Sequence, residues 1–534
     1  MAAELVGTTI GVIGLLGQLF DGCIKAYGYF TTASQLDTDS QRLMCKVRIE
    51  EMRLVVWGRE WGVAEGRLEA HLDSGRNPQL RALAMQILKE LHGTVADFRK
   101  LQDRYGLVED HGAQDKDGEA SNGSAKAGRG WRKEVGLRTK WVIADKDKFT
   151  NLLRDLKDFN DGLERLFPAW QLPSLQRAWT HQLLESAQRD LGELSLLETA
   201  STGIYPQLEA SAKLKRLRIN LDSTPQSAFK PTFALRVPRA ALAVEDLDSP
   251  RRCRARHEAA GDVVVEWVDY DADAVDERVV HVRRMDDLAR MMHSASERHP
   301  DLHSVDCVGY TDDAARSRYG LVYKAPAPSF ATLHALIAST DLKTPDLNDR
   351  VRLARTLAIA LWSLHSLDWL HKSLCASNVL FFPSAFSSAA AAAAAVVPDI
   401  SAPSLSGFDA SRPDLDAALS VAPRNPSIED LHRHPAALRG RPHRKAFDVY
   451  SLGLVLLEIG LWKVLQTFHK PHYAPDRWRD KVLLAVLVPG LAAKVGRLYA
   501  SVVDMCLRAG EDLESGEAGK LMETVVTTLE SIRV

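Results

Sequence analysis

Residues 371–382 have the sequence HKSLCASNVLFF, and this stretch decides how the C-terminal half of the chain is interpreted. Its polar part runs from His371 to Asn378, and an apolar run of strand-like composition follows directly. The apolar spacing predicts an amphipathic helix before it, at residues 351–367. A second helix is predicted at residues 448–461, which are nearly all apolar and therefore buried.

Short strands are predicted upstream of these helices. Residues 263–267 (VVVEW) form a β-branched run, and residues 319–324 (YGLVYK) have the composition of another strand. Strands followed by helices indicate an α+β domain with a small sheet-rich lobe and a larger helical lobe. We expect this domain at residues 241–534, interrupted by an Ala-rich surface insertion at residues 387–397.

The N-terminal part of the sequence has helical periodicity. Apolar residues recur at three- and four-residue steps along residues 80–101, 152–166 and 184–197. No alternating strand pattern appears before about residue 230. Successive amphipathic helices bury their apolar stripes against one another, so an all-helical bundle is predicted over residues 1–220.

Two polar segments interrupt this organisation. Residues 109–130 are polar and glycine-rich. They can bury too little apolar surface to offset the conformational entropy lost on ordering, so they are predicted to form a mobile loop. Pro225, Pro231 and Pro238 break helical patterning and indicate a linker at residues 221–240. The predicted fold class is therefore multidomain: an all-α helical bundle followed by an α+β domain of two lobes.

Composition excludes some classes of partner and site. The formal net charge is -2, so no basic face for a nucleic-acid partner is expected. The six cysteines form no CxxC pair, which favours reduced thiols in a cytoplasmic protein. Histidines such as His432 and His434 lack further ligands at metal-binding spacing, so no metal site is predicted.

The first apolar segment, residues 5–20, is uncharged but contains four glycines. It is shorter than the roughly 20 residues that span a bilayer. A buried first helix is the simpler interpretation, and a helix that contacts membranes conditionally is the alternative. The apolar positions of this segment that would contact a membrane are Leu5, Ile10, Val12, Leu15, Leu16, Leu19 and Phe20.

The stretch quoted first resembles the catalytic loop of protein kinases, whose pattern is H-R-D-L-x-x-x-N before an apolar strand. His371, Leu374 and Asn378 match that pattern. Residues 405–413 (LSGFDASRP) stand where the metal-binding D-F-G triplet belongs, and residues 448–456 resemble the start of the helix that anchors the loop. The resemblance implies a protein-kinase-like domain of two lobes.

The carboxylates that perform phosphoryl transfer are missing. In kinases the loop aspartate accepts the substrate's proton, and the D-F-G aspartate holds magnesium. Ser373 and Gly407 occupy these positions, and a serine hydroxyl cannot replace a carboxylate as base. No glycine-rich phosphate loop is found, and Val268, or Glu266 in another register, replaces the phosphate-binding lysine. We therefore predict a pseudokinase with no catalytic residue and no cofactor.

Two alternatives stay open for this domain. Asn378 and Asp409 would be the ligands for ATP and magnesium in an atypical kinase or nucleotide-binding protein, because Asp409 follows Gly407 closely. In the second alternative the chain is a passive scaffold whose domains only bind partner proteins.

The N-terminal segment combines an apolar opening at residues 6–20, the sequence DGCIKAY at residues 21–27, and a charged helix ending in Trp57 and Gly58. These features resemble the HeLo (prion-inhibition and propagation) domain of fungal HET-s and related proteins, over residues 3–215. The resemblance implies a helical bundle tied to heterokaryon incompatibility and regulated cell death. In some members the first apolar helix is released and enters membranes. The C-terminal domain resembles the divergent kinase-like domains that accompany HeLo domains in filamentous fungi.

These resemblances imply an effector in cell-death signalling, with a HeLo-like output domain and a regulatory kinase-like domain. Expected partners are other proteins, including further copies of the HeLo-like domain. The chain is expected in the cytoplasm, with membrane association on activation.

Overall fold

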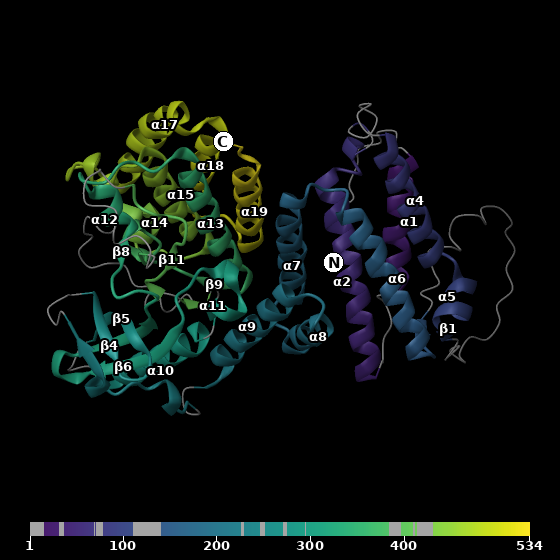
Figure 1. The fold of residues 1–534 in the computed structure, drawn as a ribbon, viewed down its shortest axis with the longest axis horizontal. Coiled ribbons are helices and arrows are strands. Elements are labelled where there is room, and N and C mark those ends of the chain that lie inside the picture. The colour runs from purple at the N-terminus through teal and green to yellow at the C-terminus, as the bar shows by residue number, and fades with distance from the viewer. Residues whose placement is uncertain are drawn as a thin grey trace, which may run out of the picture. The chain divides into compact units, whose positions relative to one another are not determined.

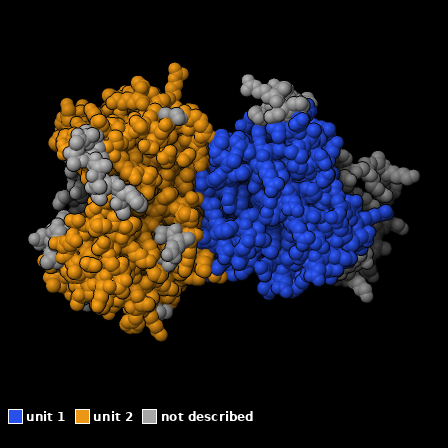
Figure 2. All heavy atoms as spheres, in the orientation of Figure 1, with its two compact units in different colours: residues 1–212 blue, residues 213–534 orange. Residues whose placement is uncertain are grey.

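The computed structural model describes residues 15–30, 37–68, 70, 78–110, 140–225, 229–245, 251–270, 275–293, 295–383, 397–408, 412–413 and 431–533. The chain divides into two compact units, Met1–Ala212 and Lys213–Val534 (Figures 1 and 2). Each unit contains a hydrophobic cluster of its own. Most of the predicted mobile loop and of the predicted Ala-rich insertion falls outside the described residues.

The first unit is built mainly from helices. They are α1 (Leu15–Phe30), α2 (Thr38–Trp61), α4 (Pro78–Val95), α5 (Phe98–Tyr105), α6 (Lys146–Glu164), α7 (Leu172–Ala187), α8 (Leu191–Ser201) and the first part of α9 (Pro206–Ser223). Aspartates begin several of them: Asp37 caps α2, Asp145 caps α6 and Asp190 caps α8 by accepting a backbone N–H from the first turn. The predicted helical bundle is thus found in this unit.

One short ribbon departs from that prediction. Strands β1 (Leu107–Asp110) and β2 (Lys140–Ile143) pair antiparallel, so the expectation of no strand before about residue 230 is wrong here. Neither strand, LVED or KWVI, alternates apolar with polar residues, so the sequence carries no strand signal here. Leu107 and Ile143, which face each other across the ribbon, are both buried in the core.

Helix α1 packs closely on α2 through an aromatic contact. The ring centroids of Phe20 and Trp57 lie 6.3 Å apart. A Cβ placed on Gly58 would lie 2.1 Å from Phe20 Cζ, so glycine is what admits the ring at this point. Trp57 in turn donates from Nε1 to the carbonyl of Leu163 in α6 at 2.9 Å. These contacts fix α1, α2 and α6 as one packed group.

A buried ion-pair network joins α2, α6 and the residue before α9. Arg53 is almost fully buried and lies 3.0 Å from Glu50, 2.7 Å from Asp161 and 2.9 Å from Glu164. Its guanidinium also donates to the Tyr205 hydroxyl at 2.7 Å, and that hydroxyl donates to Glu50. Every charge in the network has a partner, which is the condition under which buried charges are tolerated.

A curled antiparallel sheet opens the second unit, with strand order β3-β4-β5-β7-β6 (Figure 1). Its strands are β3 (Leu242–Val244), β4 (Arg252–His257), β5 (Gly261–Asp269), β6 (Cys307–Asp313) and β7 (Arg318–Lys324). Helix α10 (Val275–Met292) connects β5 to β6 and packs against β6 and β7. The two strands predicted from sequence correspond to parts of β5 and β7.

A larger helical part follows the sheet. Its helices are α12 (Leu333–Ala338), α13 (Leu347–Ser366), α14 (Pro435–Leu438), α15 (Lys445–Leu461), α16 (Pro475–Arg477), the π-helix η12 (Trp478–Leu487), α17 (Val488–Val495), α18 (Arg497–Leu507) and α19 (Ser515–Ser531), whereas the short α11 (Ala295–Arg298) precedes β6. Helix α15 is central, since residues 445–460 are all buried and α13, α17, α18 and α19 pack on it. The two helices predicted here correspond to α13 and α15.

Short strands hold the connections between these helices. They are β8 (Ala331–Thr332), β9 (Trp369–Leu370), β10 (Val379–Phe381), β11 (Ser404–Leu405) and β12 (Arg412–Pro413). Strand β10 pairs with both β8 and β11, and β9 pairs with β12. The second unit therefore has the predicted α+β order, with the sheet first and the helices after it.

Helix α9 continues across the boundary between the units. Its C-terminal part belongs to the second unit, where Lys215 is buried and lies 3.0 Å from Asp368. Arg283 donates to the carbonyl of Leu221 at 3.0 Å. The segment predicted as a linker, residues 221–240, therefore begins inside a docked helix.

Candidate functional site

The loop at residues 371–378 connects β9 to β10 and is anchored by Asp448 of α15. The Asp448 carboxylate is fully buried and accepts hydrogen bonds from the backbone N–H groups of His371 and Lys372, both at 2.8 Å. Lys372 has a positive φ of 66°, which an L-residue adopts only where surrounding contacts hold it. The anchor predicted from the sequence around residue 448 thus fixes the loop backbone.

Two histidines complete the surroundings of Asp448. His443 Nε2 lies 2.8 Å from one carboxylate oxygen, and His365 Nε2 lies 3.3 Å from the other. Burial opposes ionisation, but the charge of His443 and the hydrogen bonds from both rings hold the pKa of Asp448 well below its usual range. Asp448 is therefore a structural anion and has no proton to exchange near neutral pH.

His371 supports the loop from inside. Its buried ring faces Phe408, with the two ring centroids 4.9 Å apart. Burial lowers the pKa of His371 to about 4, so the imidazole is neutral. Its Nδ1 accepts the backbone N–H of Ser373 at 3.3 Å. This histidine therefore positions the loop backbone.

Ser373 stands at the position where protein kinases have the aspartate that acts as catalytic base. Its hydroxyl oxygen lies 3.0 Å from Asn378 Nδ2 and 3.3 Å from a guanidinium nitrogen of Arg251. Asn378, which ends the turn η7 (Ala376–Asn378), also donates to the Ser373 carbonyl. A neutral hydroxyl that accepts hydrogen bonds from an amide and a guanidinium does not act as a general base near neutral pH.

Gly407 lies just after β11, where an aspartate would hold magnesium in a kinase. Its φ is 83°, and its backbone N–H donates to Glu266 at 3.0 Å. A Cβ at Gly407 would lie 2.3 Å from Asn378 Nδ2. The site therefore has no room for a side chain at this position while Asn378 keeps its place.

An ion pair between neighbouring strands fills the centre of the site. Glu266 on β5 lies opposite Arg252 on β4, and their carboxylate and guanidinium form a salt bridge. The two side chains are 0% and 8% exposed, respectively. Arg252 also donates to Asn378 Oδ1 at 3.1 Å and to the Ser377 carbonyl at 3.0 Å. Glu266, Arg252, Asn378 and Ser373 thus form one connected polar network.

This network does not fit a magnesium-bound nucleotide. Magnesium is usually held by one or two carboxylates together with substrate phosphates and water. The carboxylate that the described part of the site offers is Glu266, which is already paired with Arg252 and with a backbone N–H. Within the described ranges no cluster of three or more metal-ligating side chains occurs. Asp409, the alternative ligand, lies outside the described residues.

Arg251 and Arg252 contribute to this site but were not predicted from the sequence. Arg252 and Arg251 precede the first buried residue of β4, and their role depends on the register that sets Arg252 opposite Glu266. The sequence carried one signal, the alternation of Cys253 and Ala255 with polar residues, which is typical of a strand. Of the two positions considered for the missing lysine, Glu266 is the one that contacts the loop after β11.

The predicted membrane segment is only partly described. Leu16 is fully buried and Leu15 is 54% exposed, while Leu19 and Phe20 are partly buried against the core of the first unit. Leu5, Ile10 and Val12 lie outside the described residues. Among the helices in the described ranges, none is both long enough and apolar enough to cross a membrane.

Two family models match parts of the chain. Residues 7–197 match the HeLo family, described as prion-inhibition and propagation, which supports the resemblance found at the N-terminus. Residues 265–528 match a domain of unknown function (DUF7580), a match that brings no activity with it. No curated protein matches the chain. The kinase-like assignment of the second unit therefore stays a prediction.

Proposed function

We propose that this chain is a signalling effector in fungal incompatibility or regulated cell death. In this proposal the HeLo-type helical unit produces the output, and the second unit is a kinase-like domain without phosphotransferase activity that recognises the signal. The match of residues 7–197 to the HeLo family supports the first part. The geometry around Gly407 is the single observation that carries the second part.

The order of elements supports a kinase-like second unit. A five-stranded antiparallel sheet, with helices α10 and α11 between β5 and β6, precedes a larger helical part. A loop with the spacing of the kinase pattern lies between β9 and β10, and a buried aspartate of α15 anchors its backbone. Fold likeness alone does not assign an activity, so the function has to be argued from the site.

The site argues against phosphoryl transfer. Catalysis of this reaction is almost entirely electrostatic and needs a lysine, metal ligands and a base in place. Here Ser373 replaces the base, Gly407 cannot carry a carboxylate, and Glu266 brings a negative charge where phosphates would need a cation. An internal ion pair takes the place of the charges that a nucleotide would supply. We therefore propose recognition of proteins as the role of this unit.

The proposed output acts through self-association of the helical unit and conditional contact of the N-terminal apolar segment with membranes. The chain would then reside in the cytoplasm until it is activated. In this mechanism a charged substitution in the N-terminal apolar segment removes membrane contact and leaves the second unit unchanged.

Expression in a filamentous fungus tests this output. We expect the full chain to arrest growth and make cells permeable to a membrane-impermeant dye, and Val12→Glu to abolish both effects. Leu83→Glu is the matched control, because Leu83 is an exposed leucine on α4, outside the segment. If Val12→Glu kills as well as the unaltered chain, the membrane mechanism is wrong. A passive scaffold predicts no growth arrest from any of the three chains.

A further inference from the structure

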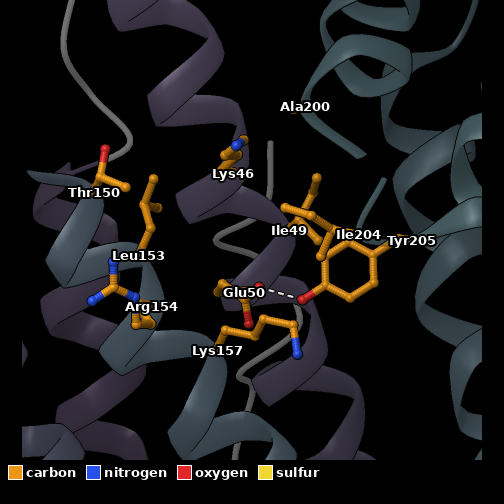
Figure 3. A pocket seen from close by; sticks show the side chains of 10 residues that line it. All are labelled: Lys46, Ile49, Glu50, Thr150, Leu153, Arg154, Lys157, Ala200, Ile204 and Tyr205. Carbon is orange, nitrogen blue, oxygen red and sulfur yellow. Dashed lines mark hydrogen bonds between the residues drawn. The ribbon is translucent and has the colours of Figure 1, made fainter. Parts of the chain in front are cut away.

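A cavity of about 220 Å³ lies within the first unit, among α2, α6, the end of α8 and the residues before α9 (Figure 3). Aliphatic side chains from three elements line it: Ile49 from α2, Leu153 from α6 and, after α8, Ile204. A well-formed apolar cavity with a few polar groups at its edge is the usual form of a small-molecule site. Neither family match assigns a ligand to this unit.

The acidic group of the cavity wall is already satisfied. Glu50 accepts hydrogen bonds from the Tyr205 hydroxyl, from Arg53 at 3.0 Å and from Asn160 Nδ2 at 2.8 Å. Figure 3 shows the bond between Glu50 and Tyr205 at the edge of the space. Glu50 therefore already has three hydrogen-bond donors within the protein, one of them the guanidinium of Arg53.

Two of the three basic side chains that line the cavity differ from Glu50 in their hydrogen bonding. Lys46 of α2 and Arg154 of α6 both line it, and among the residues that the structure describes neither forms an ion pair or a hydrogen bond. Lys157, the third basic residue, is engaged by Asp161. Burial and repulsion from Arg42 lower the pKa of Lys46.

We propose that this cavity binds an aliphatic chain that ends in an anionic group. The chain lies along Ile49, Leu153 and Ile204, and the anion lies between Lys46 and Arg154. The cavity volume of about 220 Å³ exceeds the roughly 150 Å³ of an apolar cavity that accommodates benzene. A carboxylate on a chain of about eight carbons therefore suits its size.

Calorimetric titration of the full chain with octanoate tests this proposal. We expect saturable binding of octanoate, weaker binding of octanol, which lacks the charge, and none of butyrate, which lacks the chain. Lys46→Gln and Arg154→Gln should each weaken octanoate binding roughly fivefold, the upper value for a partly exposed ion pair. Lys89→Gln and Arg99→Gln remove exposed cations outside the cavity and should change nothing.

A cavity-filling variant makes the test independent of charge. Ala200 is a buried cavity residue, so Ala200→Leu adds volume inside the cavity and should block octanoate, while circular dichroism checks that the helices persist.

Vesicles of anionic phospholipid form a second arm of the experiment. Vesicle binding that Ala200→Leu abolishes would identify a membrane lipid as the source of the ligand, and octanoate binding alone would identify a free acid. The proposal is overturned if neither probe binds, or if binding is unchanged in Ala200→Leu and in both charge variants.

Discussion

Removing the cation beside Glu266 tests whether the polar network holds the centre of the second unit together. Arg252→Met keeps an unbranched side chain of similar reach but leaves the fully buried Glu266 carboxylate without its salt bridge. The donors left to Glu266 are the Gly407 N–H at 3.0 Å and the Tyr323 hydroxyl at 3.5 Å. Breaking a buried ion pair from one side costs roughly 3–5 kcal/mol. We expect the free energy of unfolding of the second unit to fall by about this amount.

Removing both charges should recover most of this loss. In Arg252→Met combined with Glu266→Gln, no buried charge is left without a partner, and the glutamine still offers an oxygen to the Gly407 N–H.

Urea unfolding of the full chain, followed by pulsed hydrogen exchange of peptides from β4 and β5, measures these changes. Arg256→Met is the matched control, because Arg256 is an exposed arginine on the same strand and its loss should cost less than about 0.5 kcal/mol. The reasoning is refuted if Arg252→Met costs under about 1 kcal/mol, or if the double variant is as unstable as the single one.

Three further changes test other contacts. Gly407→Asp should destabilise the second unit by about 1–3 kcal/mol in urea unfolding and create no magnesium-dependent ATP binding, because the new Cβ overlaps the loop asparagine at a positive φ. Gly58→Ala should loosen α1, seen as faster amide exchange in residues 15–30, because the added methyl overlaps the Phe20 ring. Asp368→Asn tests pH dependence: burial opposes ionisation, but Lys215 and a second lysine hold the pKa of Asp368 below its ordinary value. That stability is present above about pH 4 and is lost as pH falls through the lowered pKa, so the deficit of the variant should shrink progressively as the pH falls below about 4.

Matched variants separate these effects from general damage. Gly510→Asp and Gly93→Ala place side chains in open space, so neither should reproduce the losses at positions 407 and 58. If Gly93→Ala loosens α1 as much as Gly58→Ala does, the contact with Phe20 is not what holds that helix. If the Asp368→Asn deficit does not shrink at any pH below about 4 at which the unit stays folded, the ion pairs of Asp368 do not stabilise the unit.

Periodicity and loop spacing predicted much of the architecture. The apolar stripes identified the N-terminal helices, and the nearly continuous apolar run of α15 identified a buried helix. Both signals are local, because each helix carries its own pattern of burial. The ribbon β1–β2 escaped prediction because neither strand alternates apolar with polar residues and each pairs with a partner far away in sequence.

The sequence predicted which kinase residues the candidate site lacks, but not which residues occupy their space. Ser373 and Gly407 stood out because they replace carboxylates at fixed positions in a motif. The pairing of Arg252 with Glu266 depends on strand register, which no local pattern in this sequence specifies. The docking of Lys215 beside Asp368 depends on tertiary packing, so α9 was assigned to the helical unit and a linker was expected soon after it.

Calorimetric titration of the full chain with ATP, with and without magnesium, measures whether the second unit binds nucleotide. We expect no saturable heat at millimolar nucleotide under either condition, because Glu266, Arg252 and Asn378 already satisfy one another. Magnesium-dependent binding that is lost in Asn378→Ala or Asp409→Ala would contradict this expectation and establish a nucleotide-binding protein.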